Sequence, residues 1–184
     1  MFTMKVDHEI ELQLFQPQHA DELFRLVDMN RHYLRKWLPW IDDVTSPAHF
    51  YSLIPAWLMQ FTENNGFSLG IRFKGILVGN IGLNYIDWHN RQTAMGYFLA
   101  EDAQGYGIMT RAVQALVNYA FFELDLNRIE IRCGEKNIKS RAIPERLGFT
   151  FEGRIRDGEN LYGQYHDIFV YSILKSEWTR KVRY

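Results

Sequence analysis

Apolar and polar residues alternate in residues 9–15, the first clearly patterned segment of the chain. A period of two is typical of a strand with one buried face, so this segment predicts a strand. Pro17 then opens a stretch with the three- and four-residue spacing of a helix, and Pro39 ends it. The positions that carry this helical spacing are Leu23, Val27, Asn30, Leu34 and Trp37.

A second helix is predicted after Ser46 and Pro47, because serine is a favoured N-terminal cap and proline fits the first helical turn. Its apolar face consists of Phe50, Leu53, Ile54, Trp57, Leu58 and Phe61. Pro55 lies inside this pattern and predicts a kink or a break, since proline removes a helical hydrogen bond. The sequence Asn-Asn-Gly at residues 64–66 predicts the end of the helix.

Strands and helices both recur in the rest of the chain. Strands are predicted at residues 67–73, 76–84, 92–100, 128–133, 150–156 and 167–174. A long amphipathic helix is predicted from Gly107 onward, and a short helix is predicted after residues 128–133. The apolar stripe of the long helix is Met109, Ala112, Val113, Leu116, Val117, Ala120 and Phe121.

The predicted order is a strand, two helices, three strands, a helix, a strand, a helix and two strands. That order indicates an α+β (α/β) fold, in which helices pack on the faces of one mixed sheet. No internal repeat, low-complexity run or linker interrupts residues 1–184, so the chain is predicted to be a single domain.

Composition excludes several classes of protein. Of the 184 residues 47% are hydrophobic and 23% are charged, which argues against disorder. The net charge of -1 supplies no long-range field toward nucleic acid or an anionic membrane. The single cysteine, Cys133, excludes an internal disulfide framework, and neither a signal core nor a membrane span is found. These features predict a soluble protein of the cytoplasm that binds neither nucleic acid nor membrane.

The segment 101–110 is the strongest candidate for ligand binding. Gly105 and Gly107 allow backbone conformations closed to other residues and let a ligand approach the main chain. The amides at the start of the following helix have no helical partner, and such a terminus binds pyrophosphate. A tight turn that needs glycine only for its geometry is the alternative interpretation. Neither known nucleotide motif is present, since no Gly-Lys-Ser/Thr occurs and Thr110 replaces the third glycine of the dinucleotide fingerprint.

A second candidate segment surrounds the short helix. Asn137 precedes it and Gly148 follows it. Each residue has a sufficient structural role on its own, Asn137 as the N-terminal cap and Gly148 as the left-handed C-terminal residue.

Together the two segments resemble the acyl-CoA core of the GNAT N-acetyltransferase superfamily, and the chain resembles the Rim-type ribosomal-protein acetyltransferases within it. The resemblance runs from about Glu9 to Trp178. The residues that carry it are Tyr33 to Trp40, Gly96 to Leu99, Gln104 to Met109, Asn137, Ser140, Gly148, Phe149, Glu152, Gly153 and residues 163–167. The sequence departs from the family pattern at two places. Asp102 stands where many members have Gln or Arg, and Pro144 lies inside the short helix, where it removes a hydrogen bond and crowds the carbonyl of Ser140.

The resemblance implies a mixed, mostly antiparallel sheet of about seven strands with about four helices, and acetyl-CoA as co-substrate. The residues expected to contact acetyl-CoA are Phe98, Leu99, Gln104, Gly105, Tyr106, Gly107, Ile108, Met109 and Asn137. The backbone of Phe98 and Leu99 is expected to run beside the pantetheine arm. Asp102 is expected to point away, so that backbone amides hold the pyrophosphate.

The resemblance also implies the chemistry. Acetyl is expected to pass to a primary amine by direct attack in a ternary complex, most simply to the N-terminal α-amine of a ribosomal protein. Glu159, in the predicted turn 157–160, is the candidate base for the amine, and Ser140 is the candidate donor to the departing sulfur. Each has a simpler alternative, a solvated turn glutamate and a capping serine. Candidates for an acceptor groove are Tyr33, Trp37, Trp40 and Trp57, although a stripe at helical spacing is also typical of a core.

Two further functions remain open. One is acetylation of a small amine such as a polyamine or an antibiotic, and the other is a non-catalytic acyl-CoA-binding module. No metal site is expected, because the six histidines include no pair at three- or four-residue spacing and there is one cysteine. Aromatic residues beyond those that the core patterns use predict a homodimer. They are Trp88, Tyr162 and Tyr165.

Overall fold

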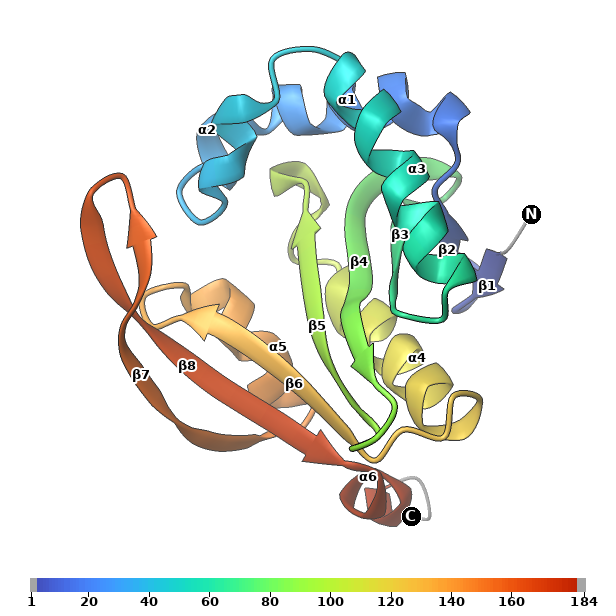
Figure 1. Ribbon diagram of the computed structural model, residues 1–184, viewed down its shortest axis with the longest axis vertical. Coiled ribbons are helices and arrows are strands. Elements are labelled where there is room, and N and C mark those ends of the chain that lie inside the picture. The colour runs from blue at the N-terminus through green and yellow to red at the C-terminus, as the bar shows by residue number, and fades with distance from the viewer. Residues whose placement is uncertain (1–2, 182–184) are drawn as a thin grey trace.

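The computed structural model describes residues 3–181, in which one eight-stranded sheet carries helices on both faces (Figure 1). The strands are β1 (Thr3–Lys5), β2 (Ile10–Leu14), β3 (Phe67–Phe73), β4 (Ile76–Asp87), β5 (Gln92–Leu99), β6 (Arg128–Gly134), β7 (Thr150–Leu161) and β8 (Gln164–Leu174). The α-helices are α1 (Ala20–Met29), α2 (Arg31–Leu34), α3 (Ala48–Thr62), α4 (Ile108–Phe122), α5 (Ile138–Arg146) and α6 (Lys175–Lys181). Three 3₁₀ helices are η1 (Pro17–His19), η2 (Pro39–Asp43) and η3 (Glu101–Ala103).

The sheet has the strand order β1-β2-β3-β4-β5-β6-β8-β7. All neighbours are antiparallel except β5 and β6, which run parallel. A parallel pair needs a long crossover, and here α4 supplies it. The predicted mixed, mostly antiparallel fold is therefore confirmed, with β1 as an eighth strand too short to give a clear alternation.

The helix predicted over residues 17–39 is divided. Its first part ends at Asn30, whose side-chain amide donates to the carbonyl of Leu26 at 2.9 Å. The chain then forms α2 and η2 in place of one continuous helix. In contrast, α3 is continuous through Pro55, so the predicted break there is wrong. The division and the added α6 give six α-helices in residues 3–181 where about four were expected. None of these helices is long and apolar enough to cross a membrane.

The last hairpin is longer than predicted, and this corrects the position of Glu159. The predicted turn at residues 157–160 is wrong, because β7 continues to Leu161 and Glu159 pairs with His166 of β8. The actual turn is at Tyr162 and Gly163, whose φ angles of 55° and 82° suit a two-residue hairpin. Alternation of apolar and polar residues does not predict the full length of β7, because the strand is exposed along most of its length.

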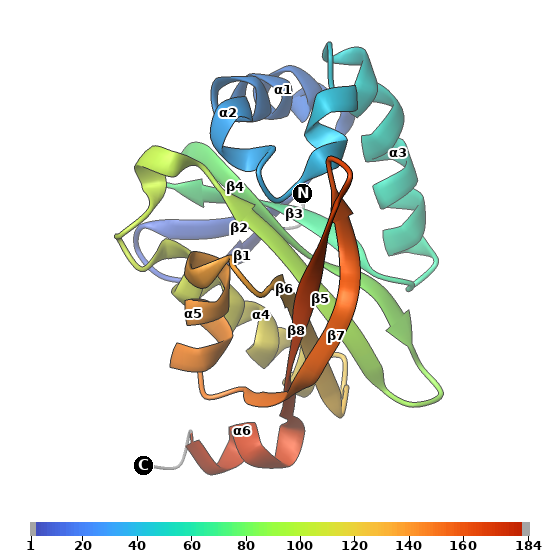
Figure 2. The ribbon, with the colours of Figure 1, turned by 90° about the vertical axis from the view of Figure 1, so that its left-hand side faces the viewer.

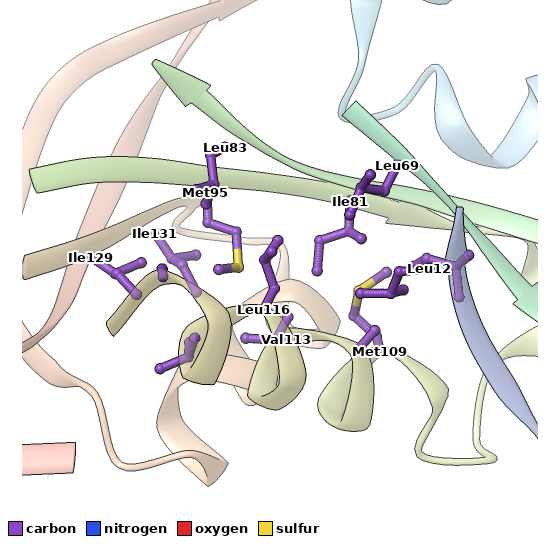
Figure 3. Packing of buried hydrophobic residues seen from close by; sticks show 14 of the residues in the cluster. Leu12, Leu69, Ile81, Leu83, Met95, Met109, Val113, Leu116, Ile129 and Ile131 are labelled. Carbon is purple, nitrogen blue, oxygen red and sulfur yellow. The ribbon is translucent and has the colours of Figure 1, made fainter. Parts of the chain in front are cut away.

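The core lies on both faces of the sheet. One cluster fills the space between the sheet and α4, and Figure 3 shows Met109, Val113 and Leu116 pointing at the strands. The other cluster packs α1 and α3 against the opposite face. Successive residues of β4 alternate between the two, since Leu77 belongs to the second cluster and Val78 packs against the first.

Candidate active site

The main cavity lies where β5 and β6 diverge. The two strands pair only over residues 92–95 and 128–131, so the later parts of both strands are not joined. A cavity of about 860 Å³ adjoins them, which is within the range of small-molecule sites. Its lining comes from α2, β5, the loop before α4, α4 and α5. The lining residues that the sequence predicted are Tyr33, Trp37, Phe98, Leu99, Gln104, Gly105, Gly107, Ile108, Met109, Asn137 and Ser140.

The loop before α4 has the geometry of an anion site. Gly105 and Gly107 have φ angles of 85° and 70°, and no atom lies within 4 Å of the position that a Cβ would take at either residue. Within the described part of the chain, the N–H groups of Gly107, Ile108 and Met109 have no hydrogen-bond partner. These donors lie at the positive end of the α4 dipole. The loop therefore offers donors that suit a pyrophosphate group.

One edge of β5 is open beside this loop. Residues 96–99 of β5 pair with β4, but within residues 3–181 no strand pairs with them on the β6 side. An extended amide-containing ligand can hydrogen-bond to such an edge as an added strand does. Phe98 and Leu99, the two residues expected beside the pantetheine arm, both line the cavity.

Ser140 lies on the opposite wall, at the start of α5. Asn137 caps that helix by accepting a hydrogen bond from the Ser140 N–H at 3.3 Å. The hydroxyl of Ser140 donates to Cys133 Sγ at 3.2 Å, and the Tyr97 hydroxyl donates to the Ser140 carbonyl at 3.0 Å. Burial raises the pKa of both Cys133 and Tyr97, so both stay protonated at neutral pH. Pro144 leaves α5 continuous, and Ser140 lines the cavity.

The carboxylate of Glu159 lies beside Trp37, at the end of β6. A Cβ built on Gly134 would lie 3.4 Å from the Trp37 ring and 3.7 Å from Glu159 Oε2. Both side chains therefore approach the space that a side chain at residue 134 would fill. Trp37 lines the cavity and Glu159 adjoins it from the β7–β8 side without belonging to the lining itself.

The environment of Glu159 favours a base. Partial burial raises the pKa of its carboxyl above the ordinary value, and the charge of His166 opposes that shift. A carboxylate with a raised pKa accepts a proton more readily than a solvated one.

Besides Glu159, three predicted residues lie outside the cavity lining, namely Tyr106, Trp40 and Trp57. Tyr106 is 63% exposed and stacks on Phe73, with 6.2 Å between ring centroids. Trp40 is 37% exposed and lies 6.3 Å from the ring of Phe98, next to the lining. Trp57, by contrast, packs into the second core cluster.

The sequence did not indicate a polar bridge across the cavity. Gln104 donates to the Tyr33 hydroxyl and accepts from Lys139 Nζ at 2.6 Å. The same ammonium lies 5.7 Å from the centroid of the Tyr33 ring. The bridge joins α2, the loop before α4 and α5, which no sequence spacing connects.

A second unpredicted contact joins the hairpin tip to the segment after α2. The Tyr162 hydroxyl donates to the Arg35 carbonyl at 2.7 Å, and the Arg35 guanidinium lies 5.0 Å from the Tyr162 ring centroid. Figure 2 shows the tip of the β7–β8 hairpin rising toward α2. The side of the cavity that holds Trp37 and Glu159 is therefore bounded by both elements. In residues 3–181 no group of three or more His, Cys, Asp or Glu side chains could hold a metal ion.

Comparison with known proteins agrees with this geometry. A family model described as an acetyltransferase (GNAT) domain matches residues 9–150. The chain is 41% identical over 179 residues to YdaF of Bacillus subtilis (strain 168), whose naming as a ribosomal N-acetyltransferase is provisional; the match covers 97% of this chain and 98% of that protein. It is 29% identical over 170 residues to the ribosomal-protein-serine acetyltransferase of Escherichia coli (strain K12), covering 92% and 95%.

Two similar solved structures contain CoA or acetyl-CoA. RimL, a ribosomal L7/L12 α-N-protein acetyltransferase in complex with CoA, superposes with a TM-score of 0.91 at 29% identity, covering 94% of this chain and 98% of that chain. The microcin C7 self-immunity acetyltransferase MccE, in complex with acetyl-CoA and AMP, superposes with a TM-score of 0.89 at 30% identity, covering 93% and 95%. The chain belongs to the GNAT family of acetyltransferases and uses acetyl-CoA as its acetyl donor.

Proposed function

We propose that this enzyme acetylates the N-terminal α-amine of a protein, and that the acceptor is a ribosomal protein. Its similarity to two proteins named as ribosomal-protein acetyltransferases supports this acceptor class. A ribosomal acceptor places the reaction in the cytoplasm. The acetyl group passes directly from acetyl-CoA to the amine, with both substrates bound and no covalent enzyme intermediate.

One observation carries the proposal: Ser140 and Glu159 lie next to two successive residues of β6, Cys133 and Gly134. Ser140 contacts Cys133, whereas the Glu159 carboxylate lies next to Gly134. Successive residues of a strand face opposite sides of the sheet. The donor for the sulfur and the base for the amine therefore act from opposite faces, where the strands diverge and leave room for two substrates to meet.

The residues on the acetyl-CoA side supply binding and polarisation. The amides of Gly107, Ile108 and Met109 hold the pyrophosphate, Gln104 adds a side-chain contact, and Asn137 contacts the pantetheine arm. The open edge of β5 at Phe98 and Leu99 binds that arm and directs an N–H group at the thioester carbonyl.

The residues on the acceptor side remove a proton. A free α-amine has a pKa of about 7.7–8.0, so most of it is protonated at neutral pH. Glu159 accepts that proton, directly or through one water, and the freed nitrogen attacks the carbonyl carbon. Ser140 donates a hydrogen bond to the sulfur as its bond to carbon breaks. Tyr33 and Trp37 line the path of the acceptor, and Trp40 extends it.

A small amine is the second candidate acceptor. The likeness to MccE, whose structure holds AMP together with acetyl-CoA, favours this alternative. An acceptor with an aromatic base would stack on Trp37 or Trp40, which adjoin the cavity.

Acetyl-CoA turnover on a panel of amines tests the proposal. The panel contains peptides with a free N-terminus, the same peptides with a blocked N-terminus and an internal lysine, spermidine, and an aminoacyl adenylate analogue. Thiol release only with the free N-terminal peptides supports the proposal. Release with spermidine or the nucleotide alone supports the small-amine alternative, and CoA binding without release from any amine indicates a non-catalytic module.

A further inference from the structure

The strand that carries Glu159 is irregular just before that residue. Ile155 pairs with Ile168, and the next pair is Glu159 with His166. Four positions of β7 are thus matched by two positions of β8, so β7 holds two extra residues in a bulge. In a regular register Asp157, and not Glu159, would stand opposite His166. Because of the bulge, Glu159 rather than Asp157 lies opposite His166.

The bulge has two features that fix its shape. Asp157 has a φ of 49°, in the left-handed region, which is unfavourable for most residues. Gly158 has no room for a side chain, because an added Cβ would lie 2.9 Å from Ile168 Cγ1 and 3.1 Å from Ile155 Cγ2. This conformation needs an external contact to hold it.

Asp167 supplies that contact from the facing strand. Its Oδ1 accepts a hydrogen bond from the Asp157 N–H at 2.8 Å, and its Oδ2 lies 3.2 Å from Arg154 Nε. Its own carbonyl accepts from the Glu135 N–H at 2.9 Å, next to the Gly134 that adjoins Glu159. Only 19% of the Asp167 side chain is exposed, while Arg154 is half exposed. Asp167 is therefore anchored both to the end of β6 and to the bulge.

We propose that Asp167 is a positioning residue that folds the bulge at Asp157 and Gly158 and thereby aims Glu159 at the amine. The proposal rests on Glu159 being the base of the proposed function. It gives a role to the segment 163–167, which the sequence singled out and which the cavity lining does not contain. Asp167 holds the left-handed Asp157 by a single hydrogen bond. Glu159 follows two residues later, so its carboxylate keeps its position only while that bond is made. A displacement of about 1 Å costs on the order of 10²-fold in rate.

Asp167→Ala and Asp167→Asn separate the two contacts of this side chain. The alanine variant loses the acceptor for the Asp157 N–H, and we expect kcat to fall by about 10- to 100-fold with the Kd for CoA unchanged. The asparagine variant keeps an acceptor and loses only the charge pair with half-exposed Arg154, so we expect it to restore most of the loss. The acid limb of the kcat profile should move to lower pH in Asp167→Ala, because a released Glu159 is less buried.

Asn160→Ala is the matched control on the same hairpin. Asn160 Oδ1 accepts from the Gly163 N–H at 2.9 Å, so its removal loosens the turn by the same kind of bond outside the bulge. We expect this variant to keep wild-type kcat. An equal loss in Asn160→Ala and Asp167→Ala would overturn the proposal, since general loosening of the hairpin would then explain both.

The double variant Asp167→Ala, Glu159→Gln decides whether Asp167 acts through Glu159. If Asp167 acts only through Glu159, the effects of the two substitutions on kcat are not additive. We therefore expect Asp167→Ala to lower kcat by less than about 2-fold when Glu159 is already replaced. A full additional loss would overturn the proposal and leave Glu159 as the base. If Asp167→Ala does not fold, Gly158→Ala disturbs the same bulge from within, and unchanged kcat in that variant would also overturn it. Wild-type turnover by Glu159→Gln would instead refute the proposed base, and with it this role for Asp167.

Discussion

The hydroxyl of Ser140 donates to the sulfur of Cys133 at 3.2 Å, so the candidate donor for the leaving group already contacts a sulfur atom in the free enzyme. Cys133 is buried, and that burial keeps its thiol protonated. A thiol sulfur is a weak acceptor. The Ser140 hydroxyl is therefore held loosely and can turn to a stronger acceptor on the cavity side.

Ser140→Ala should lower kcat by about 10-fold, because it removes a hydrogen bond to the departing sulfur but leaves the base in place. Steady-state kinetics with the true acceptor would measure this. Cys133→Ala is the matched control, since it removes the present partner of the hydroxyl and not the hydroxyl itself. We expect kcat in that variant to stay within about 2-fold of wild type. A larger loss from Cys133→Ala than from Ser140→Ala would contradict the role given to Ser140.

Gly107→Val should weaken CoA binding by at least about 10-fold. A valine at a φ of 70° is strained, and its branched side chain would enter the space through which the phosphates approach the amides. Titration calorimetry with CoA measures the change in Kd. Gly75→Val is the control, because Gly75 has a comparable φ of 83° and equally open surroundings in the turn between β3 and β4. If both variants bind CoA equally well, the loop before α4 does not hold the pyrophosphate.

The sequence predicted the position and conformation of the loop before α4 because glycine spacing and helix periodicity are local properties. The φ angles at Gly105 and Gly107, and the Asn137 cap of α5, are the local conformations that these residue types favour. The sequence predicts a turn at Glu159 because β7 is mostly exposed and shows no alternation there, and the bulge at Asp157 lies just before it. Beyond the bulge β7 pairs with β8 again, and Asp167 of β8 contacts the bulge at Asp157. No feature of the local sequence indicates this contact.

Tertiary contacts were the least predictable part of the site. The bridge from Gln104 to Tyr33 and Lys139 joins three elements that are far apart in the sequence. The residues with helical spacing before Pro39 differ in role, although their spacing is the same. Val27 is buried in the core, whereas Trp37 lines the cavity.

A homodimer is expected, and light scattering at micromolar concentration should give twice the chain mass of 21.9 kDa. The reason is the exposure of large aromatic side chains, which are enriched where proteins associate. Tyr165 is 64% exposed and Trp88 is 43% exposed. If Tyr165 or Trp88 anchors the interface, replacing that residue with serine should shift the measured mass toward that of the monomer. A mass of one chain for the wild-type protein would refute the expectation.

Glu159→Gln should lower kcat by about 10²–10⁴-fold while CoA still binds, because the amide cannot take the amine proton. In the wild-type enzyme, kcat should fall on the acid side with an apparent pKa above the ordinary glutamate value of 4.5, since burial raises the pKa of this carboxyl. Activity that is independent of pH on that side, or wild-type turnover by the variant, would place the base elsewhere.

The same substitution should stabilise the protein at neutral pH. Because its pKa is raised on folding, Glu159 binds a proton more tightly in the folded state than in the unfolded one. Its contribution to stability therefore falls as the pH rises from the unfolded pKa, near 4.5, through the higher folded pKa, and then stays constant. The glutamine variant lacks the free-energy cost of keeping this carboxylate ionised in the folded protein. Its Tm should therefore exceed that of wild type at pH 7, and the difference should close as the pH falls toward 4. Thermal unfolding followed by circular dichroism at both pH values measures the gap. A Tm for Glu159→Gln below wild type at pH 7 would mean that the ionised carboxylate is stabilised where it lies, and a carboxylate so stabilised would be a poor base.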